Sequence, residues 1–253
     1  MDLNKVIDNV IRLFFILIVL YIFMEFVGEV TCMFNETEIR KQICAIGERI
    51  YSNGFVAAND GNISVRMGDE VLCTPTGVSK GYMTPDMICK VNMEGEVLET
   101  NGKNRPSSEI KMHLRVYKER LDVKAVVHAH PPFGTAYAVM DRPLDRPLIP
   151  ESVILLGSVP VARYGTPSTE EIPDAVSEYL QDYDAVLLQN HGALTCGSEL
   201  EEAYHKMESL EFYAKITFIC DMLGEPKGLN EEQVKRLYEI RKQMDLPGRH
   251  PGI

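Results

Sequence analysis

The sequence from Met33 onward predicts a single domain of the α/β class. Three observations support this prediction. Capping motifs open three segments with helical spacing, runs rich in β-branched residues alternate with them, and Gly or Pro turn signals separate the two kinds of segment. Residues 34–253 contain no internal repeat, low-complexity tract or linker. One hydrophobic core is therefore expected for this part of the chain.

One helix and four strands are predicted for the first half of the domain. The helix begins at Asn35, which forms a capping box with Glu38, and it ends at Gly54. Its apolar face is marked by residues at helical spacing, namely Ile39, Ile43, Ile46 and Ile50. Short β-rich runs then predict strands at Asn62–Arg66, Glu70–Thr74, Ile88–Asn92 and Glu96–Glu99.

The second half is predicted to alternate helices with buried strands. A helix is expected to start near Ser107 or Ser108 and to run to about Arg120. Apolar runs then predict strands at Val123–Val127, Ser152–Ala162 and Ala185–Leu188. Two further capping boxes open the last two helices. Ser198 with Glu201 opens a helix to about Leu223, and Asn230 with Gln233 opens a helix over Asn230–Met244.

The composition limits the classes of function. Of 253 residues, 45% are hydrophobic and 25% are charged, which is ordinary for a folded globular chain. The net charge of −11 argues against nucleic acid or an anionic membrane surface as the main partner, because both require a cationic face. A small anionic ligand in a local pocket is still allowed. The six cysteines form no CxxC pair, so we expect a reducing cytoplasmic location rather than a disulfide-rich secreted scaffold.

The first 32 residues differ in character from the rest. Leu13–Met24 is an uncharged apolar run, and the wider span Val10–Val27 contains only Arg12 and Glu25 as charges. A helix over that span would be about 27 Å long, slightly short of the bilayer core. Three interpretations remain open: a helical membrane anchor through residues 10–27 with the rest of the chain in the cytosol, a signal peptide, or a non-native extension. The predicted division is thus 1–32 and 33–253.

Three histidines have the spacing of a metal site. His128 and His130 end a Val-rich strand at i, i+2, which places both imidazoles on one face of that strand. His191 follows a second apolar run in the same relative place. Three protein ligands with a fourth position open are typical of catalytic zinc. The remaining histidines, His113, His205 and His250, are interpreted as structural.

Three polar segments upstream resemble anion cradles. They are Asp60–Ser64, Thr74–Gly77 and Pro106–Glu109, and each combines hydroxyl or amide side chains with turn glycines or a helix start. Such groups hold a phosphate without net positive charge on the protein. Glu109 falls in the first helical turn, where a carboxylate complements the helix dipole or, beside a metal, exchanges a proton with substrate.

Five linked motifs resemble the class II aldolase/adducin family. They are GNISVR (61–66), TPTG (74–77), PSSE (106–109), VVHAH (126–130) and LLQNHG (187–192), over roughly residues 36–224. The likeness is greatest to the family's L-fuculose-phosphate aldolases. It implies a three-layer α/β/α sandwich, here with an N-terminal hydrophobic helix, and a homotetramer with sites at subunit boundaries.

The resemblance also implies the roles of individual residues. His128, His130 and His191 match ligands of one zinc ion per subunit, and Glu109 matches the catalytic acid/base that completes zinc coordination in the free enzyme. The positions matching the phosphate site are Asn62, Thr76, Gly77, Ser107 and Ser108. The implied reaction is zinc-dependent cleavage of a ketose 1-phosphate, such as L-fuculose 1-phosphate, into dihydroxyacetone phosphate and an aldehyde such as lactaldehyde.

Two departures from the family pattern leave other reactions open. Family aldolases carry a tyrosine from a neighbouring subunit in the segment that corresponds to Ile149–Tyr164, which is shorter here and holds only Tyr164 at its end. We interpret Tyr164 as a packing residue. The C-terminal tail does not match closely. The alternatives are a ribulose-5-phosphate 4-epimerase, a methylthioribulose-1-phosphate dehydratase or a decarboxylase, and a non-catalytic adducin-like scaffold. Glu109, where the epimerases carry aspartate, favours the aldolase over the epimerase.

Overall fold

The structure, a computed structural model, describes residues 35–252. It divides into two units, residues 1–40 and 41–253, and the described part of the first unit, residues 35–40, is helical. The predicted anchor at residues 10–27 and the boundary between residues 32 and 33 lie outside the described residues. Within residues 35–252, no helix is long and apolar enough to span a bilayer. The second unit is described below.

A mixed sheet forms the centre of the second unit. Its described strands are β1 (Asn62–Met67), β2 (Glu70–Cys73), β3 (Cys89–Asn92), β4 (Val97–Glu99), β5 (Ala125–Ala129), β6 (Val161–Ala162), β7 (Ala185–Leu188) and β8 (Gly192–Gly197). They lie in the order β4-β3-β2-β1-β5-β8-β7-β6. All neighbours pair antiparallel except β6 and β7. Since β5 and β7 both pair antiparallel with β8, they run in the same direction and end at the same edge of the sheet.

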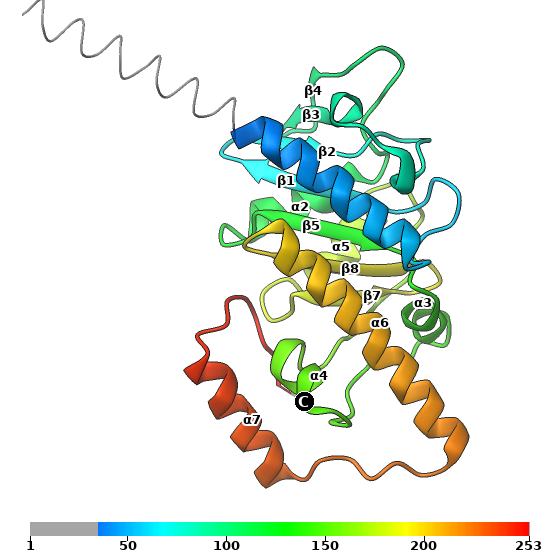
Figure 1. Ribbon diagram of the computed structural model, residues 1–253, viewed down its shortest axis with the longest axis vertical. Coiled ribbons are helices and arrows are strands. Elements are labelled where there is room, and N and C mark those ends of the chain that lie inside the picture. The colour runs from blue at the N-terminus through cyan, green and yellow to red at the C-terminus, as the bar shows by residue number, and fades with distance from the viewer. Residues whose placement is uncertain (1–34, 253) are drawn as a thin grey trace, which may run out of the picture. The chain divides into compact units, whose positions relative to one another are not determined.

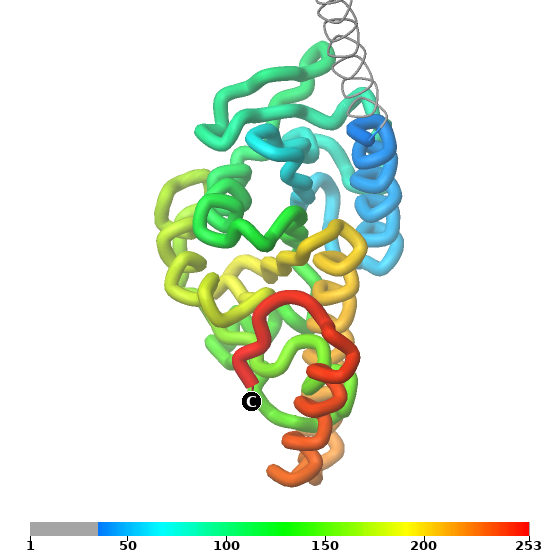
Figure 2. Tube along the Cα trace, turned by 90° about the vertical axis from the view of Figure 1, so that its left-hand side faces the viewer, coloured from blue at the N-terminus to red at the C-terminus, as the bar shows by residue number. Residues whose placement is uncertain are grey.

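Helices cover both faces of the sheet, as Figures 1 and 2 show. On one face lie α6 (Leu200–Leu223) and the helix formed by residues 41–52, and on the other lie α2 (Ile110–Glu119) and α5 (Glu171–Ser177). The remaining described helices are α3 (Pro132–Val139), α4 (Pro150–Leu155), α7 (Glu231–Gln243) and the 3₁₀ turns Lys80–Tyr82 and Pro85–Met87. The predicted three-layer α/β/α sandwich is confirmed.

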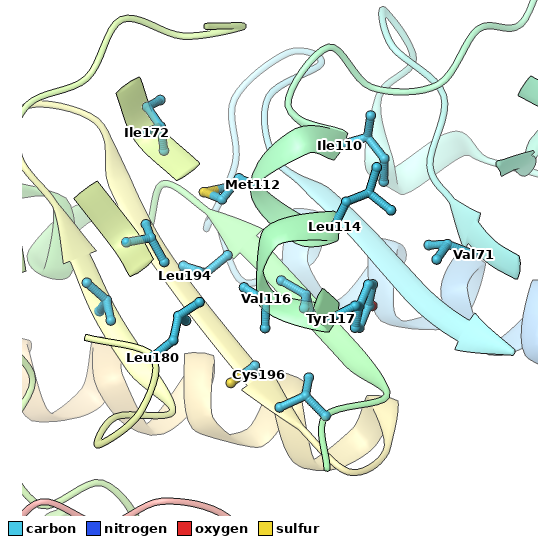
Figure 3. Close-up of a cluster of buried hydrophobic side chains, with 14 of the residues drawn as sticks. Val71, Ile110, Met112, Leu114, Val116, Tyr117, Ile172, Leu180, Leu194 and Cys196 are labelled. Atoms are coloured by element: carbon cyan, nitrogen blue, oxygen red, sulfur yellow. The ribbon is translucent and has the colours of Figure 1, made fainter. Parts of the chain in front are cut away.

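The core between the sheet and α2 fixes the helix that carries Glu109 at its start. Met112, Val116 and Tyr117 project from α2 toward the sheet, where they meet Leu194 and Cys196 (Figure 3). These side chains recur at helical spacing, so α2 buries one face completely. Burial of several large apolar side chains stabilises this packing by roughly 1.5–3 kcal/mol each. The N-terminus of α2 is thereby held against the edge of the sheet where β5 ends.

Two sequence predictions in the second half were wrong. The segment 152–162 is not one strand, because Pro150 occupies the first turn of α4, where its missing N–H costs nothing, and only Val161–Ala162 pair as β6. Gly157, with φ 65°, ends α4 and donates its N–H to the Ser152 carbonyl. The strand β8 was not predicted, since glycines at both of its ends and only six residues weaken its pattern.

One of the three capping boxes is confirmed by its hydrogen bonds and one is wrong. Asn230 and Gln233 form the reciprocal pair at the start of α7. Ser198, by contrast, bonds through both its backbone N–H and its hydroxyl to the Glu202 carboxylate, one residue beyond the predicted partner Glu201. The helix α6 therefore starts later than predicted, with Glu199 in the N-cap position.

Candidate functional site

The three predicted histidines converge at one edge of the sheet. His128 is the fourth residue of β5, His130 follows that strand directly, and His191 lies in the turn between β7 and β8. The centroids of their rings lie 4.7 to 5.0 Å apart. One nitrogen from each ring falls within 4.8 Å of the others. The proximity expected from sequence is confirmed, and their role as metal ligands remains a prediction.

Local backbone geometry brings His191 to the other two rings. Asn190 has φ 58°, a conformation that asparagine tolerates better than most residues, and this residue turns the chain between β7 and β8. The next strand begins at Gly192, where a Cβ atom would lie 2.5 Å from the Ala129 carbonyl oxygen and 2.6 Å from His130 Cδ2. Glycine is therefore required for β8 to approach β5 closely enough at this point.

Glu109 lies against the histidine cluster. It occupies the N-cap position of α2, and its carboxylate oxygens lie 3.4 Å from His128 Nε2 and 3.3 Å from His191 Nε2. Its Oε1 atom and His191 Nδ1 are buried without a hydrogen-bond partner. An unpartnered buried carboxylate oxygen is costly unless a cation or donor meets it.

The spacing of these donor atoms suits a tetrahedral metal ion. With metal–nitrogen bonds of about 2.0–2.1 Å, neighbouring ligand atoms of a tetrahedron lie about 3.4 Å apart. The observed separations are 3.2 Å between His130 Nε2 and His128 Nε2, besides the two carboxylate contacts of 3.3 and 3.4 Å. Three imidazoles and one carboxylate therefore suit a zinc-like ion in donor type, and these three contacts, two of them made by different oxygens of Glu109, are close to that spacing.

Burial favours the neutral form of two of these imidazoles, His128 and His191, and the neutral form is the one that binds metals. Burial, with the adjacent His191 and His130, lowers the pKa of His128 well below its usual value. Burial likewise lowers the pKa of His191, against an opposing effect of Glu109. Neutral His128 donates Nδ1–H to the Ala193 carbonyl at 2.9 Å, which leaves the lone pair of Nε2 directed into the cluster.

The predicted phosphate-binding positions lie on strands and turns beside this cluster. Asn62 is the register partner of His128 across β1 and β5, and its Nδ2 donates to Glu109 Oε2 at 2.9 Å. The segments that carry Thr76 and Ser107 are joined by two backbone hydrogen bonds, from Thr76 N to the Arg105 carbonyl and from Ser107 N to the Thr74 carbonyl. The remaining two positions in these segments are Gly77, with φ 72°, and the exposed Ser108.

One residue near the site was misread in the sequence. His113, interpreted as structural, is buried, but its Nε2 lies 2.5 Å from Asn62 Oδ1, so it belongs to the surroundings of Glu109. Its position four residues after Glu109 on one helix was the available signal. Tyr164 is 52% exposed in the single subunit, and its interpretation as a packing residue stays a prediction. The two other histidines stay apart from the cluster: His205 is exposed beside Glu201, and His250 contacts the Val153 carbonyl.

Comparison with known proteins connects this arrangement to a family. The model of the Class II Aldolase and Adducin N-terminal domain matches residues 41–218. An L-fuculose phosphate aldolase of Methanococcus maripaludis is 33% identical over 182 residues, which cover 72% of this chain and 96% of that protein. A 3-oxo-tetronate 4-phosphate decarboxylase of Escherichia coli K12 is 35% identical over 190 residues, 73% of this chain and 88% of that protein.

A solved structure extends the likeness to three dimensions. The crystal structure of an L-fuculose-1-phosphate aldolase from Thermus thermophilus superposes with a TM-score of 0.67 at 33% identity. The match covers 76% of this chain and 99% of the Thermus chain. The Methanococcus and Escherichia coli relatives are named for different reactions, although each is about equally similar to this chain. The likeness by itself therefore leaves the reaction open.

Proposed function

Because this chain belongs to the class II aldolase and adducin family, we propose that it is a zinc-dependent aldolase of phosphorylated ketoses. The proposed substrate is a ketose 1-phosphate like L-fuculose 1-phosphate, and the proposed products are dihydroxyacetone phosphate and an aldehyde such as lactaldehyde. The observation that supports this best is the position of Glu109, whose two carboxylate oxygens contact His128 and His191 while Asn62 donates to the oxygen that faces His128.

The residues of the cluster would hold one zinc ion per subunit. His128, His130 and His191 would be its ligands, with Glu109 as the fourth in the absence of substrate. When bound, zinc would supply Lewis-acid polarisation of the substrate carbonyl. His128 and His191 would stay neutral, since burial lowers the pKa of both rings.

The polar segments around the start of α2 would bind the phosphate. Hydroxyl, amide and backbone N–H groups of the five predicted positions would take the place of cationic side chains: Asn62, Thr76, Gly77, Ser107 and Ser108. The partial positive charge at the N-terminus of α2 adds to this attraction. An anionic substrate is thereby compatible with a chain of net charge −11.

Glu109 would act as the acid/base of the reaction. Once substrate displaces its carboxylate from the cluster, Glu109 would take up a proton and deliver it to C3, the carbon freed when the C3–C4 bond breaks; the balance is kept because the C4 hydroxyl loses one proton as the aldehyde forms. Its hydrogen bond from Asn62 would keep the carboxylate near the reacting carbon instead of in solvent.

A sugar-acid phosphate decarboxylase is the second candidate. The Escherichia coli relative named 3-oxo-tetronate 4-phosphate decarboxylase is 35% identical to this chain, and decarboxylation requires the same polarised carbonyl and proton return. The epimerase, dehydratase and scaffold alternatives are less favoured. The scaffold is least favoured, because a non-catalytic member need not keep three converging histidines and Glu109.

The proposed assembly is a homotetramer in the cytoplasm with sites at subunit boundaries. Large apolar side chains exposed on α6 and at the C-terminal end of α3 would suit such contacts: Val139, Met140, Phe212, Phe218 and Met222. We further propose that residues 33–253 form the catalytic domain and that residues 1–32 form a separate segment.

A substrate panel tests the proposed function. Purified full-length protein is incubated with ketose 1-phosphates that differ in configuration, and separately with 3-oxo-tetronate 4-phosphate. Release of dihydroxyacetone phosphate, aldehyde, carbon dioxide, epimer and dehydrated product is measured before and after chelation. Chelator-sensitive aldehyde release from a ketose 1-phosphate is expected. Carbon dioxide alone would replace the aldolase with the decarboxylase, and full activity after complete zinc removal would overturn the zinc mechanism.

A further inference from the structure

A chain of buried polar side chains runs from the core of the domain to Glu109. Tyr117 Oη lies 2.7 Å from Ser64 Oγ, and Ser64 Oγ lies 2.7 Å from His113 Nδ1. The opposite ring nitrogen, His113 Nε2, lies 2.5 Å from Asn62 Oδ1. Asn62 Nδ2 then donates to Glu109 Oε2 at 2.9 Å. The chain connects β1 to α2, since Asn62 and Ser64 are on the strand and His113 and Tyr117 are on the helix.

The direction of each hydrogen bond in this series of side chains follows from Glu109, its last member. An ionised carboxylate accepts only, so the Asn62 amide must turn its NH₂ group to Glu109 and its oxygen to His113. An amide oxygen cannot donate, so His113 Nε2 must carry the ring proton. His113 Nδ1 is then an acceptor, which receives the Ser64 hydroxyl proton. The Ser64 hydroxyl proton is used at His113, so the single Tyr117 hydroxyl proton is shared between Ser64 Oγ at 2.7 Å and the Ser64 backbone carbonyl at 2.9 Å.

The surroundings of His113 keep its ring neutral. The side chain is 1% exposed, and no carboxylate lies within hydrogen-bond distance of it among the described residues. Three titratable groups lie around it: Tyr117 is linked through Ser64, Glu109 is linked through Asn62, and His128 on β5 interacts with it electrostatically. Burial accordingly lowers the pKa of His113 to about 3. A neutral ring with one donor and one acceptor is what the chain requires.

We propose that His113 is a positioning residue for Glu109, acting through the orientation of the Asn62 amide. His113 Nε2–H fixes Asn62 Oδ1, so that Nδ2 has one hydrogen for the Glu109 carboxylate and a second for an anion beside it. Without that donor the amide is free to rotate and to present Oδ1 to Glu109, where two acceptors repel each other. His113 touches no substrate itself. As a role in turnover, the inference rests on the proposed aldolase or decarboxylase function.

Substitutions at His113 distinguish a role in positioning the Asn62 amide from a role in packing. His113→Phe keeps the ring volume and removes both nitrogens, whereas His113→Gln keeps an N–H near the position of Nε2. The matched control is His205→Phe, because His205 lies exposed on α6. With the substrate that the panel identifies, His113→Phe is expected to lower kcat at least tenfold at unchanged zinc content. His113→Gln is expected to restore most of that loss, and the control is expected to behave as wild type.

Two outcomes of the kinetics would overturn the positioning role. One is an unchanged kcat in His113→Phe. The other is an equal loss in His113→Phe and His113→Gln with zinc content and thermal midpoint retained, since only packing would then matter. If His113→Phe does not fold, the comparison of wild type with His113→Gln still decides, because a positioning role requires kcat to stay within a few-fold.

Nitrogen NMR tests the arrangement without any turnover. In ¹⁵N-histidine-labelled protein, the His113 signals are identified by their loss in His113→Gln. They are expected to show a proton on Nε2 and none on Nδ1, without titration between about pH 5.5 and pH 8. A proton on Nδ1, or titration in that window, would overturn the inference. A wild type inactive on the whole panel would overturn the proposed function alone, because the NMR result would still report the orientation of the chain.

Discussion

Asn62 and His128 lie directly opposite each other in the antiparallel register of β1 and β5. Both side chains reach the same carboxylate oxygen, since Glu109 Oε2 is 2.9 Å from Asn62 Nδ2 and 3.4 Å from His128 Nε2. A single backbone pairing thus fixes a predicted phosphate-binding residue and a predicted metal ligand relative to the acid/base. Slippage of β1 by one residue would turn the Asn62 side chain to the opposite face of the sheet from His128.

The substitution Glu109→Gln should separate proton transfer from folding. The amide has nearly the same volume and can still contact Asn62, but it cannot exchange a proton with substrate. We expect kcat to fall by about 10²–10⁴, typical for loss of a general acid/base, with the fold and most of the zinc retained. Steady-state kinetics and metal analysis measure this. Glu170→Gln is the control, because Glu170 is an exposed partner of Lys111. An unchanged kcat would remove Glu109 from the proton path.

The substitution Gly192→Ala should disturb the histidine cluster without removing a ligand. The added methyl would lie 2.5 Å from the Ala129 carbonyl oxygen and 2.6 Å from His130 Cδ2, so the strand or the ring must move. We expect zinc affinity to fall at least tenfold, as measured by competition with a chromophoric chelator. Gly228→Ala is the matched control, because the nearest atom to its Cβ would be the Pro147 carbonyl oxygen at 3.3 Å. Equal zinc affinity in both variants would contradict the predicted metal site.

The convergence of the histidines was predictable from the sequence because it depends on local periodicity. Because side chains alternate along a strand, the i, i+2 spacing is enough to place His128 and His130 on one face. Similar apolar runs precede His130 and His191, which indicated that both lie at strand ends. The link between His113 and Asn62 was not predictable, since the two residues are 51 positions apart and meet only when α2 packs on β1. The strand predicted at 152–162 failed for a different reason, which is local. One proline, Pro150, decided between helix and strand for a run that contains β-branched residues.

Lys80 should make stability depend on alkaline pH. Its ammonium group is 2% exposed and donates to the Asn59 and Val78 carbonyls, and burial lowers its pKa to about 8 despite the nearby Asp60. Between that value and the unfolded value of 10.5, the unfolded chain binds more protons than the folded one. The contribution of Lys80 to the free energy of unfolding therefore rises with pH in this window, by at most about 1.4 kcal/mol per unit.

Urea unfolding of Lys80→Met and wild type measures this dependence. Relative to Lys80→Met, wild type should gain stability between about pH 8 and pH 10, because the variant carries no titrating group there. The exposed Lys118 on α2 supplies the control Lys118→Met, which should show no such divergence from wild type. A difference between wild type and Lys80→Met that stays constant with pH would contradict the inferred deprotonation of Lys80.

The buried Asp184 should contribute more to stability than any surface ion pair of the described chain. Its carboxylate accepts from Arg120 and Lys206, both at 2.8 Å, and from the backbone N–H of Arg249 at 2.8 Å. The side chains of the three charged groups are 1% to 7% exposed. The substitution Asp184→Asn leaves two buried cations with one counter-charge fewer and weakens the attachment of the C-terminal tail. Breaking such a pair costs about 3–5 kcal/mol.

Asp174→Asn is the matched control for this substitution. It removes the same charge from the surface pair with Arg115, where 52% of the aspartate side chain is exposed, and such pairs contribute about 0–1 kcal/mol. Urea unfolding at one protein concentration should separate the two variants by at least about 2 kcal/mol. Equal loss in both would mean that Asp122 and Glu202, the other carboxylate partners of Arg120 and Lys206, compensate the two cations without Asp184. The buried network would then contribute no more to the free energy of unfolding than the surface pair does.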